Sequence, residues 1–278
     1  NAVIASPLKD ELLFADAPIA HKADLLRVHA ATYVDYIFGI APKAGLVRLD
    51  GDTSMGPMSL AATLHATGAV IHATDLVMQG KVDNAFCCIR PPGHHAGRAN
   101  SAGFCIFNHV AIGVAYALEK YKLKRVAIID FDVHHGDGTE DIFKDNANVM
   151  LCSTFQHPFY PHKGAESASD HMLNVPLPAK SNGKSFRKVF EKSFRPALEA
   201  FKPEFIFISA GFDAHANDPL ADLALTKKDY VWITKFIQHI AKKHANNRIV
   251  SSLEGGYHLS SLAEVAVAHI ETLSSPYD

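Results

Sequence analysis

The sequence predicts a single α/β domain built on a doubly wound, mainly parallel β-sheet with helices on both faces. Short runs rich in β-branched and aromatic residues recur along the chain, and amphipathic helical patterns separate them. These runs are apolar throughout and do not alternate with polar residues, which is typical of strands buried on both faces of a parallel sheet. The 278 residues contain no linker, repeat or low-complexity tract, so we expect one domain over residues 1–278.

The individual elements follow from the local patterns. The predicted strands, each bounded by turn residues, are 85–89, 126–131, 148–155, 205–210 and 248–253. The predicted helices are 59–80, 108–121, 183–202, 227–244 and 259–273. The first of these ends at Gly80, and a stripe of phenylalanines along 183–202 is interpreted as core packing. The polar segments 50–58 and 156–184 are expected to be loops that shape a pocket.

Bulk composition narrows the classes of function. A formal net charge of -2 gives no general electrostatic reason to bind nucleic acid or a membrane surface. No uncharged apolar stretch approaches the roughly 20 residues that a membrane-spanning helix needs. The cysteines show no CxxC spacing, which indicates reduced thiols, and the opening stretch NAVIASPLKDELLF does not resemble a signal peptide. We therefore expect a cytoplasmic protein, and the compact form without tails favours a bacterial one.

Polar clusters follow four of the predicted strands directly. They are RPPGHHAG after 85–89, DFDVHHGDG at the end of 126–131, GFDAHANDP after 205–210 and LEGGYHL after 248–253. In an open α/β sheet, ligands bind beyond the carboxyl ends of the strands. Four such clusters at one edge are difficult to explain as helix caps alone, so a functional site is predicted there.

Asp132 and His134 are candidate metal ligands. Being two residues apart on an extended chain, they point to the same side and can bind one ion. The pattern is weak by itself and needs a third ligand, which Asp213 at the end of another strand supplies best. Carboxylate and imidazole together suit zinc or a neighbouring divalent metal, and three protein ligands leave a position open, as in catalytic sites.

Two histidines and two remaining carboxylates predict proton transfer beside this metal. The stretch PPG stiffens the approach to His94 and His95, and Asp130 and Asp137 can each accept an N–H from one histidine. A carboxylate in that position holds one tautomer and makes the imidazole a stronger base. Tyr257 follows a Gly-Gly pair, and its phenol can stabilise an oxyanion; an ordinary loop tyrosine is the alternative.

Taken together, RPPGHHA, GFCIFN (103–108), IIDFDVHHGDGT, SAGFDAHANDP and LEGGY resemble the zinc-dependent histone deacetylase family, in that family's order and over nearly the whole chain. LEGGY and GFDAH are similar to its class II branch and to bacterial histone deacetylase-like amidohydrolases. The resemblance implies the arginase/deacetylase fold, with zinc on Asp132, His134 and Asp213. It further implies that Asp130 orients His94, that Asp137 orients His95, and that Tyr257 stabilises the transition state.

The resemblance also implies substrate contacts and structural potassium. Gly103, Phe104 and Tyr160 match the walls of an acyl-lysine tunnel, and Asp52 matches a rim aspartate that holds the substrate backbone. One potassium ion is implied near the zinc, and a second farther away. The matching positions are Asp130, Asp132, His134, Ser153 and Thr154 for the first ion, and Phe143, Asn146 and Val149 for the second.

The implied activity is that of a zinc-dependent hydrolase of linear amide bonds, which removes acetyl or other acyl groups from lysine side chains of proteins or peptides. An acetylpolyamine or other small-amide deacylase is an alternative, although Lys227 and Lys228 lie where a polyamine site would gather acids. An arginase-like binuclear enzyme would want a carboxylate where this chain has His215. A catalytically silent acetyl-lysine-binding module is disfavoured by the intact set of candidate catalytic residues.

One departure from the family pattern concerns the start of the chain. The family usually carries a strand and an HPE-like segment ahead of these motifs, and neither is found in this sequence. We expect the present sequence to lack that N-terminal part of the family fold.

Overall fold

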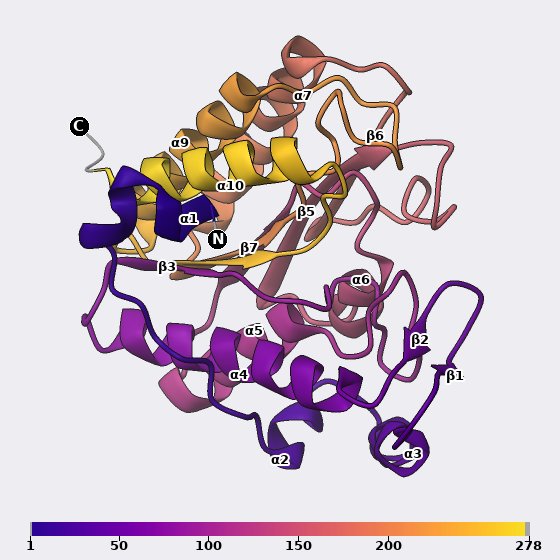
Figure 1. Cartoon of the computed structure of the whole chain (residues 1–278). Helices are drawn as coiled ribbons and strands as arrows, with labels where there is room; N and C mark the ends of the chain where they lie inside the picture. The colour runs from indigo at the N-terminus through magenta and orange to yellow at the C-terminus, as the bar shows by residue number, and fades with distance from the viewer. Residues whose placement is uncertain (1, 276–278) are drawn as a thin grey trace.

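The computed structural model, which describes residues 2–275, confirms a parallel sheet with helices on both faces (Figure 1). Six strands lie in the order β3-β8-β7-β4-β5-β6, and every neighbouring pair is parallel. They are β3 (Asn84–Cys87), β4 (Val126–Asp130), β5 (Val149–Gln156), β6 (Met172–Leu177), β7 (Phe205–Ala210) and β8 (Ile249–Leu253). Because the central strands β7 and β4 are neighbours, the segments that follow them leave the same edge of the sheet side by side.

Helices divide between the two faces, and each face has its own hydrophobic core. Figure 1 shows α4 (Ser59–Met78) and α5 (His109–Tyr121) below the sheet, with α9 (Lys227–His244) and α10 (Leu259–Ser274) above it. Successive strand residues point to opposite faces, so Ile128 packs into the core beside α4 and α5 while Ile129 packs into the other. All residues of β4, β5, β7 and β8 are buried, which confirms the inference drawn from their continuous apolar character.

The two segments predicted as loops contain short strands. β6 lies inside 156–184, and an antiparallel pair, β1 (Val47–Arg48) and β2 (Ser54–Met55), overlaps 50–58. The sequence did not indicate β6 because it contains Pro176, and proline cannot donate a backbone hydrogen bond to a neighbouring strand. The sheet tolerates this proline because β6 is an edge strand.

The helix predicted over 183–202 is not continuous. It consists of α7 (Gly183–Val189), a π-helical segment η2 (Phe190–Phe194) and α8 (Arg195–Phe201). Pro196 lacks the N–H that an uninterrupted α-helix would use here, which explains the break. The phenylalanine stripe is nevertheless core, because Phe186, Phe190 and Phe194 are almost fully buried.

The remaining helices are short. They are α1 (Ala2–Ala5), the 3₁₀ turn η1 (Pro7–Asp10), α2 (Lys22–Leu25), α3 (Ala31–Ile40) and α6 (Asp137–Phe143). Within residues 2–275, no helix combines the length and the apolar character that crossing a membrane requires.

Candidate active site

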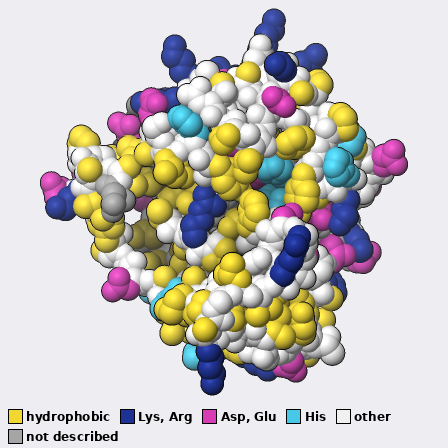
Figure 2. All heavy atoms as spheres, turned by 45° about the vertical axis from the view of Figure 1, so that its right-hand side comes forward, with side chains coloured by type: hydrophobic (Ala, Val, Ile, Leu, Met, Phe, Trp, Pro, Cys, Tyr) yellow, Lys and Arg dark blue, Asp and Glu magenta, His cyan; other side chains and the backbone are white. Residues whose placement is uncertain are grey.

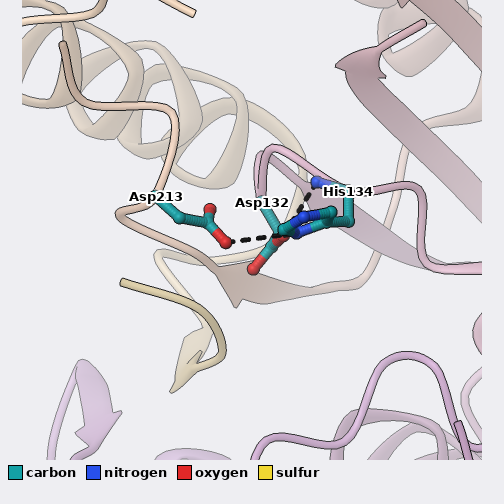
Figure 3. A group of neighbouring side chains, drawn as sticks. All are labelled: Asp132, His134 and Asp213. Carbon is teal, nitrogen blue, oxygen red and sulfur yellow. Dashed lines mark hydrogen bonds and ion pairs between the residues drawn. The ribbon is translucent and has the colours of Figure 1, made fainter. Parts of the chain in front are cut away.

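The three predicted metal ligands converge at the carboxyl ends of β4 and β7. The donor atoms of Asp132, His134 and Asp213 all lie within 4.8 Å of one another (Figure 3). His134 Nδ1 lies 3.0 Å from Asp132 Oδ1 and 3.3 Å from Asp213 Oδ2. Both carboxylates are buried, and His134 is nearly so. Burial, and then the charge of Asp132, raise the pKa of Asp213 to about 6, as expected for two acids in one water-poor site.

The surroundings of this group fit a bound cation. Asp213 Oδ1 accepts a hydrogen bond from the backbone of Val133, whereas Oδ2 is buried and accepts none within the described residues. A Cβ at Gly255 would lie 2.0 Å from Asp213 Oδ2 and 2.6 Å from Asp132 Oδ2, so only glycine leaves this space open. Two carboxylates and one imidazole match the donors of catalytic zinc sites. The chemistry of the residues and the space between them therefore suit a divalent metal.

Two histidine–aspartate pairs stand beside the metal ligands. In the inner dyad, His94 Nδ1 lies 2.9 Å from Asp130 Oδ2; in the outer dyad, His95 Nδ1 lies 2.8 Å from Asp137 Oδ1. The two imidazole rings are 4.1 Å apart between centroids, and all four residues are buried. The structure thus forms both pairings that the family resemblance implied.

The two imidazoles differ in the direction of their pKa shifts. Burial alone lowers the pKa of His94, but the carboxylates of Asp130 and Asp132 outweigh it and hold that pKa well above its usual range. Burial and the charge on His94 lower the pKa of His95 to about 4, against the opposing effect of Asp137. The pKa of His94 is thus raised and that of His95 is lowered, so His95 is the ring that more readily stays neutral and able to accept a proton.

Tyr257 comes from the loop after β8. Its backbone N–H donates to Asp218 Oδ2 at 2.7 Å, and the Arg90 guanidinium lies 5.8 Å from the centre of its ring. Burial, followed by the nearby carboxylates of Asp213 and Asp132, holds the pKa of Tyr257 well above its usual range. The phenol therefore keeps its proton and can donate it in a hydrogen bond.

The predicted tunnel residues lie beside Tyr257 and His95. Phe104, which is 43% exposed, faces Tyr257 with ring centroids 6.1 Å apart. Tyr160 contacts the ring of His95 at 5.2 Å between centroids. A Cβ at Gly103 would lie 2.2 Å from the His95 ring, so this position must be glycine. In the view of Figure 2, histidine side chains lie among hydrophobic ones near the centre of the surface that faces the viewer.

Asp52 is exposed, and one oxygen of its carboxylate binds groups of the protein itself. Asp52 Oδ1 accepts from the backbone N–H of Gly103 at 3.0 Å and from the hydroxyl of Thr53 at 2.8 Å. It therefore anchors the loop that carries Phe104. Sequence reasoning missed Phe159, whose ring stacks on His134 at 5.6 Å, because one aromatic residue in a loop gives no pattern.

Strand pairing brings together positions of the first potassium site that the resemblance implies, and a turn brings together those of the second. Asp130 in β4 pairs with Ser153 in β5, and the buried hydroxyl of Thr154 has no partner among the described residues. At the second position, the carbonyls of Phe143 and Asn146 accept backbone hydrogen bonds within one turn that leads into Val149. Potassium at these positions stays a prediction.

Two loops of the site hold each other through side chains. Arg90 donates to the carbonyls of Glu254 and Gly256, at 2.8 and 3.0 Å. Glu254 Oε2 accepts from the backbone N–H groups of Gly93 and His94, at 2.7 and 3.1 Å. Burial raises the pKa of Glu254 to about 7, against the opposing charge of His94. The sequence analysis included Glu254 in a polar cluster after a strand but predicted no role for it, because no local pattern indicates which backbone groups a side chain contacts.

Lys163 was also missed by the sequence analysis. Its Nζ lies 2.8 Å from Asp137 Oδ2, so the outer dyad's carboxylate serves both a histidine and a lysine. Lys163 and Asp137 line an open cavity of about 670 Å³ between α6 and the segment before β6. A single lysine in a polar loop carries no signal from which this contact could have been predicted.

Comparison with known proteins gives consistent matches. Residues 1–273 match the family model described as histone deacetylase domain. The chain is 39% identical to a probable deacetylase of Archaeoglobus fulgidus, covering 84% of this chain and 66% of that protein. It is 36% identical to a histone deacetylase-like amidohydrolase of Pseudomonas aeruginosa, covering 97% of this chain and 72% of that protein. The crystal structure of the HDA15 HD domain superposes with a TM-score of 0.92 at 32% identity, covering 98% of this chain and 78% of that one.

Proposed function

Because the chain belongs to the histone deacetylase family, a family of amide-bond hydrolases, we propose that it is a zinc-dependent deacylase acting on acylated lysine side chains. The observation that carries the proposal is the convergence of three side-chain functions at one point: the metal-binding group, the two dyads and Tyr257. A binding module without turnover would need the pocket but would have no use for two carboxylate-oriented histidines of different charge.

Asp132, His134 and Asp213 would hold the zinc ion, whose Lewis acidity would polarise the acyl carbonyl and lower the pKa of the attacking water. His95 is the general base, because it is neutral and its Nδ1–H donates to Asp137, which leaves Nε2 free to accept the water's proton. Its protonated form then returns the proton to the leaving amine.

His94 and Tyr257 stabilise the negative charge that develops during the reaction. His94 keeps its proton through Asp130 and holds a positive charge 4.1 Å, between ring centroids, from His95. That charge also keeps His95 from being protonated before the reaction begins. The Tyr257 phenol donates to the oxyanion, a contact of the kind worth about 2.7–4 kcal/mol in oxyanion holes.

The walls of the site suit the long methylene stem of an acylated lysine. Phe104 and Tyr160 contribute aromatic faces, and the carboxylate of Asp52 stands at the rim where a peptide backbone can donate to it. Structural potassium and a cytoplasmic location complete the proposal. The polyamine alternative remains an outcome of the test below.

The test is turnover of an acetyl-lysine peptide and of an acetylated diamine in parallel, with zinc supplied and Tyr257→Phe as the control. We expect hydrolysis of the peptide, a Tyr257→Phe protein that binds zinc normally, and a drop in its turnover of about two to three orders of magnitude. Preference for the diamine would move the protein to small-amide substrates. Turnover of neither substrate by zinc-loaded protein would contradict the proposal.

A further inference from the structure

The loops that carry the proton-transfer groups leave neighbouring strands. β3 and β8 are paired in parallel, with Cys87 opposite Ser252. The segment after β3 leads to His94 and His95, and the segment after β8 leads to Tyr257. Hydrogen bonds of the sheet fix the two strand ends, but they do not extend to the reacting groups several residues beyond.

Glu254 joins these two loops beyond the sheet. Its carboxylate accepts from the N–H groups of Gly93 and His94, and its own carbonyl accepts from the Arg90 guanidinium. It is fully buried, and its second oxygen, Oε1, has no hydrogen-bond partner within the described residues. Three of the four hydrogen bonds that link the two loops therefore involve this one residue.

We propose that Glu254 is a positioning residue, which sets the separation between the tandem histidines and Tyr257 by holding the His94 amide from the loop that bears the tyrosine. The inference rests on the proposed function and names a residue that this function had not used. Proton transfer and oxyanion stabilisation depend on the relative placement of His95 and Tyr257, and misplacement by about 1 Å can cost roughly a hundredfold in rate.

The cost of burying a carboxylate supports this role. A side chain that merely filled space between the loops would be apolar, because a buried carboxylate with an unsatisfied oxygen opposes folding. Glu254 offsets part of that cost by accepting hydrogen bonds from two backbone N–H groups, at the place where the histidine loop enters the site. The length of the Glu254 side chain, rather than its charge, is therefore the property that holds the two loops at their separation.

Two substitutions separate reach from charge. Glu254→Gln keeps the length and one carbonyl acceptor but removes the charge, whereas Glu254→Asp keeps the charge and is one methylene shorter. The proposal expects Glu254→Gln to retain kcat within roughly fivefold of wild type, the equivalent of one weakened hydrogen bond. It expects Glu254→Asp to lose about a hundredfold in kcat with little change in KM, because the substrate walls are untouched.

Glu204 offers a matched control. Its Oε2 likewise accepts from two consecutive backbone N–H groups, those of Lys124 and Arg125 at 2.6 and 2.9 Å, but at the opposite end of the sheet. Glu204→Asp therefore removes the same kind of contact without touching the site. It should leave kcat at the wild-type value.

Amide hydrogen exchange gives a readout that does not depend on activity. We expect the amides of Gly93 and His94 to be protected in wild type and in Glu254→Gln, and to exchange faster in Glu254→Asp. Zinc content should be equal in all three proteins. Glu204→Asp should lose protection at residues 124 and 125 only.

Two results would overturn the proposal. One is a Glu254→Asp protein whose Gly93 and His94 amides remain protected; the other is a Glu254→Gln protein that loses as much kcat as Glu254→Asp, which would assign the effect to charge. If the wild type hydrolyses no acyl-lysine peptide, the proposed function fails, while the exchange measurement still decides whether Glu254 holds the histidine loop.

Discussion

The inner and outer dyads look alike in sequence but occupy different environments. Asp130 is fully buried and uses one oxygen for His94 and the other for the backbone N–H of Asp132, at 3.1 Å. Asp137 uses one oxygen for His95 and the other for Lys163, whose side chain is 65% exposed. The inner carboxylate thus belongs to one rigid network, whereas the outer one is shared with a lysine at the surface.

This difference assigns different roles to two histidines adjacent in the chain. The surrounding carboxylates keep the proton on His94 despite its burial, and the resulting charge helps keep His95 neutral. In the proposed function, one histidine is therefore an electrostatic element and the other is the general base. Two identical dyads could not give the histidines different roles in this way. If both adjacent imidazoles were charged they would repel each other, and neither could accept a proton.

The largest expected effect is on turnover, where the two histidines should differ. His95→Gln should lower kcat/KM by about 10²–10⁴-fold, because it removes the proton acceptor. His94→Gln should lower it less, because it removes a charge that assists. Steady-state kinetics of both zinc-loaded variants make the comparison, and a larger loss at His94 would reverse the assignment.

The second effect is on stability, and it should be larger for the inner dyad. In Asp130→Asn, one of two required acceptors becomes an NH₂ group that faces a donor, and buried His94 loses its counter-ion. We expect the free energy of unfolding to fall by about 3–5 kcal/mol, the range for breaking a buried pair.

Asp137→Asn is the matched variant. Its carbonyl can still accept from His95, and Lys163 can turn its ammonium to solvent, so the loss should be about 1 kcal/mol. Chemical denaturation of both variants measures the difference. Equal losses would show that the two carboxylates are equivalent.

The pH dependence of stability should have opposite signs for the two histidines in the metal-free protein. The pKa of His95 is lowered to about 4, so between pH 6.5 and 4 the unfolded state binds a proton that the folded state does not. Folding free energy is therefore lost as pH falls, by up to about 1.4 kcal/mol per pH unit. The pKa of His94 is raised, so its contribution is complete below pH 6.5 and is lost as pH rises above that value.

Unfolding free energies measured from pH 4 to 8 test this prediction. His95→Gln should reduce the slope of the profile below pH 6.5, and His94→Gln should reduce its slope above pH 6.5. Three other buried histidines have lowered pKa values and the same sign as His95: His29 and His109 at about 4 and His269 at about 3. The pKa of His134 is raised to about 10 and has the same sign as that of His94, and all four contributions persist in both variants. If both variants flattened the same limb, the charge difference between the dyads would be wrong.

The smallest effect concerns Lys163. In Lys163→Gln, Asp137 loses its second partner and stabilises protonated His95 more strongly, so the acid limb of kcat/KM should move to higher pH. Because Lys163 is largely exposed and solvent screens its charge, we expect a shift of less than about one pH unit. Lys144→Gln is the control, since Lys144 lines the same cavity but pairs with Asp141 at 3.1 Å. An unchanged limb in Lys163→Gln would leave Lys163 without influence on the dyad.

Much of the fold was readable from local patterns. Continuous apolar runs predicted β4, β5, β7 and β8, because a strand buried on both faces needs such residues whatever its neighbours are. The same reading failed for β6, where Pro176 breaks the run, and for the helix over 183–202, where Pro196 interrupts the backbone ladder. From the sequence alone, a proline does not reveal whether a helix or strand ends there or continues with a local distortion.

The sequence by itself determined the candidate chemistry: the metal-binding group, the histidines with their carboxylates, and Tyr257. These residues follow strands directly, and parallel strands place their carboxyl ends at one edge, so position in the chain predicts proximity. Only the tertiary structure decided in which direction the pKa of each histidine shifts, that Lys163 shares Asp137, and that Glu254 holds an amide 161 residues away. Contacts between loop side chains and distant backbone groups have no periodicity, and the pKa of a buried group depends on every charge around it.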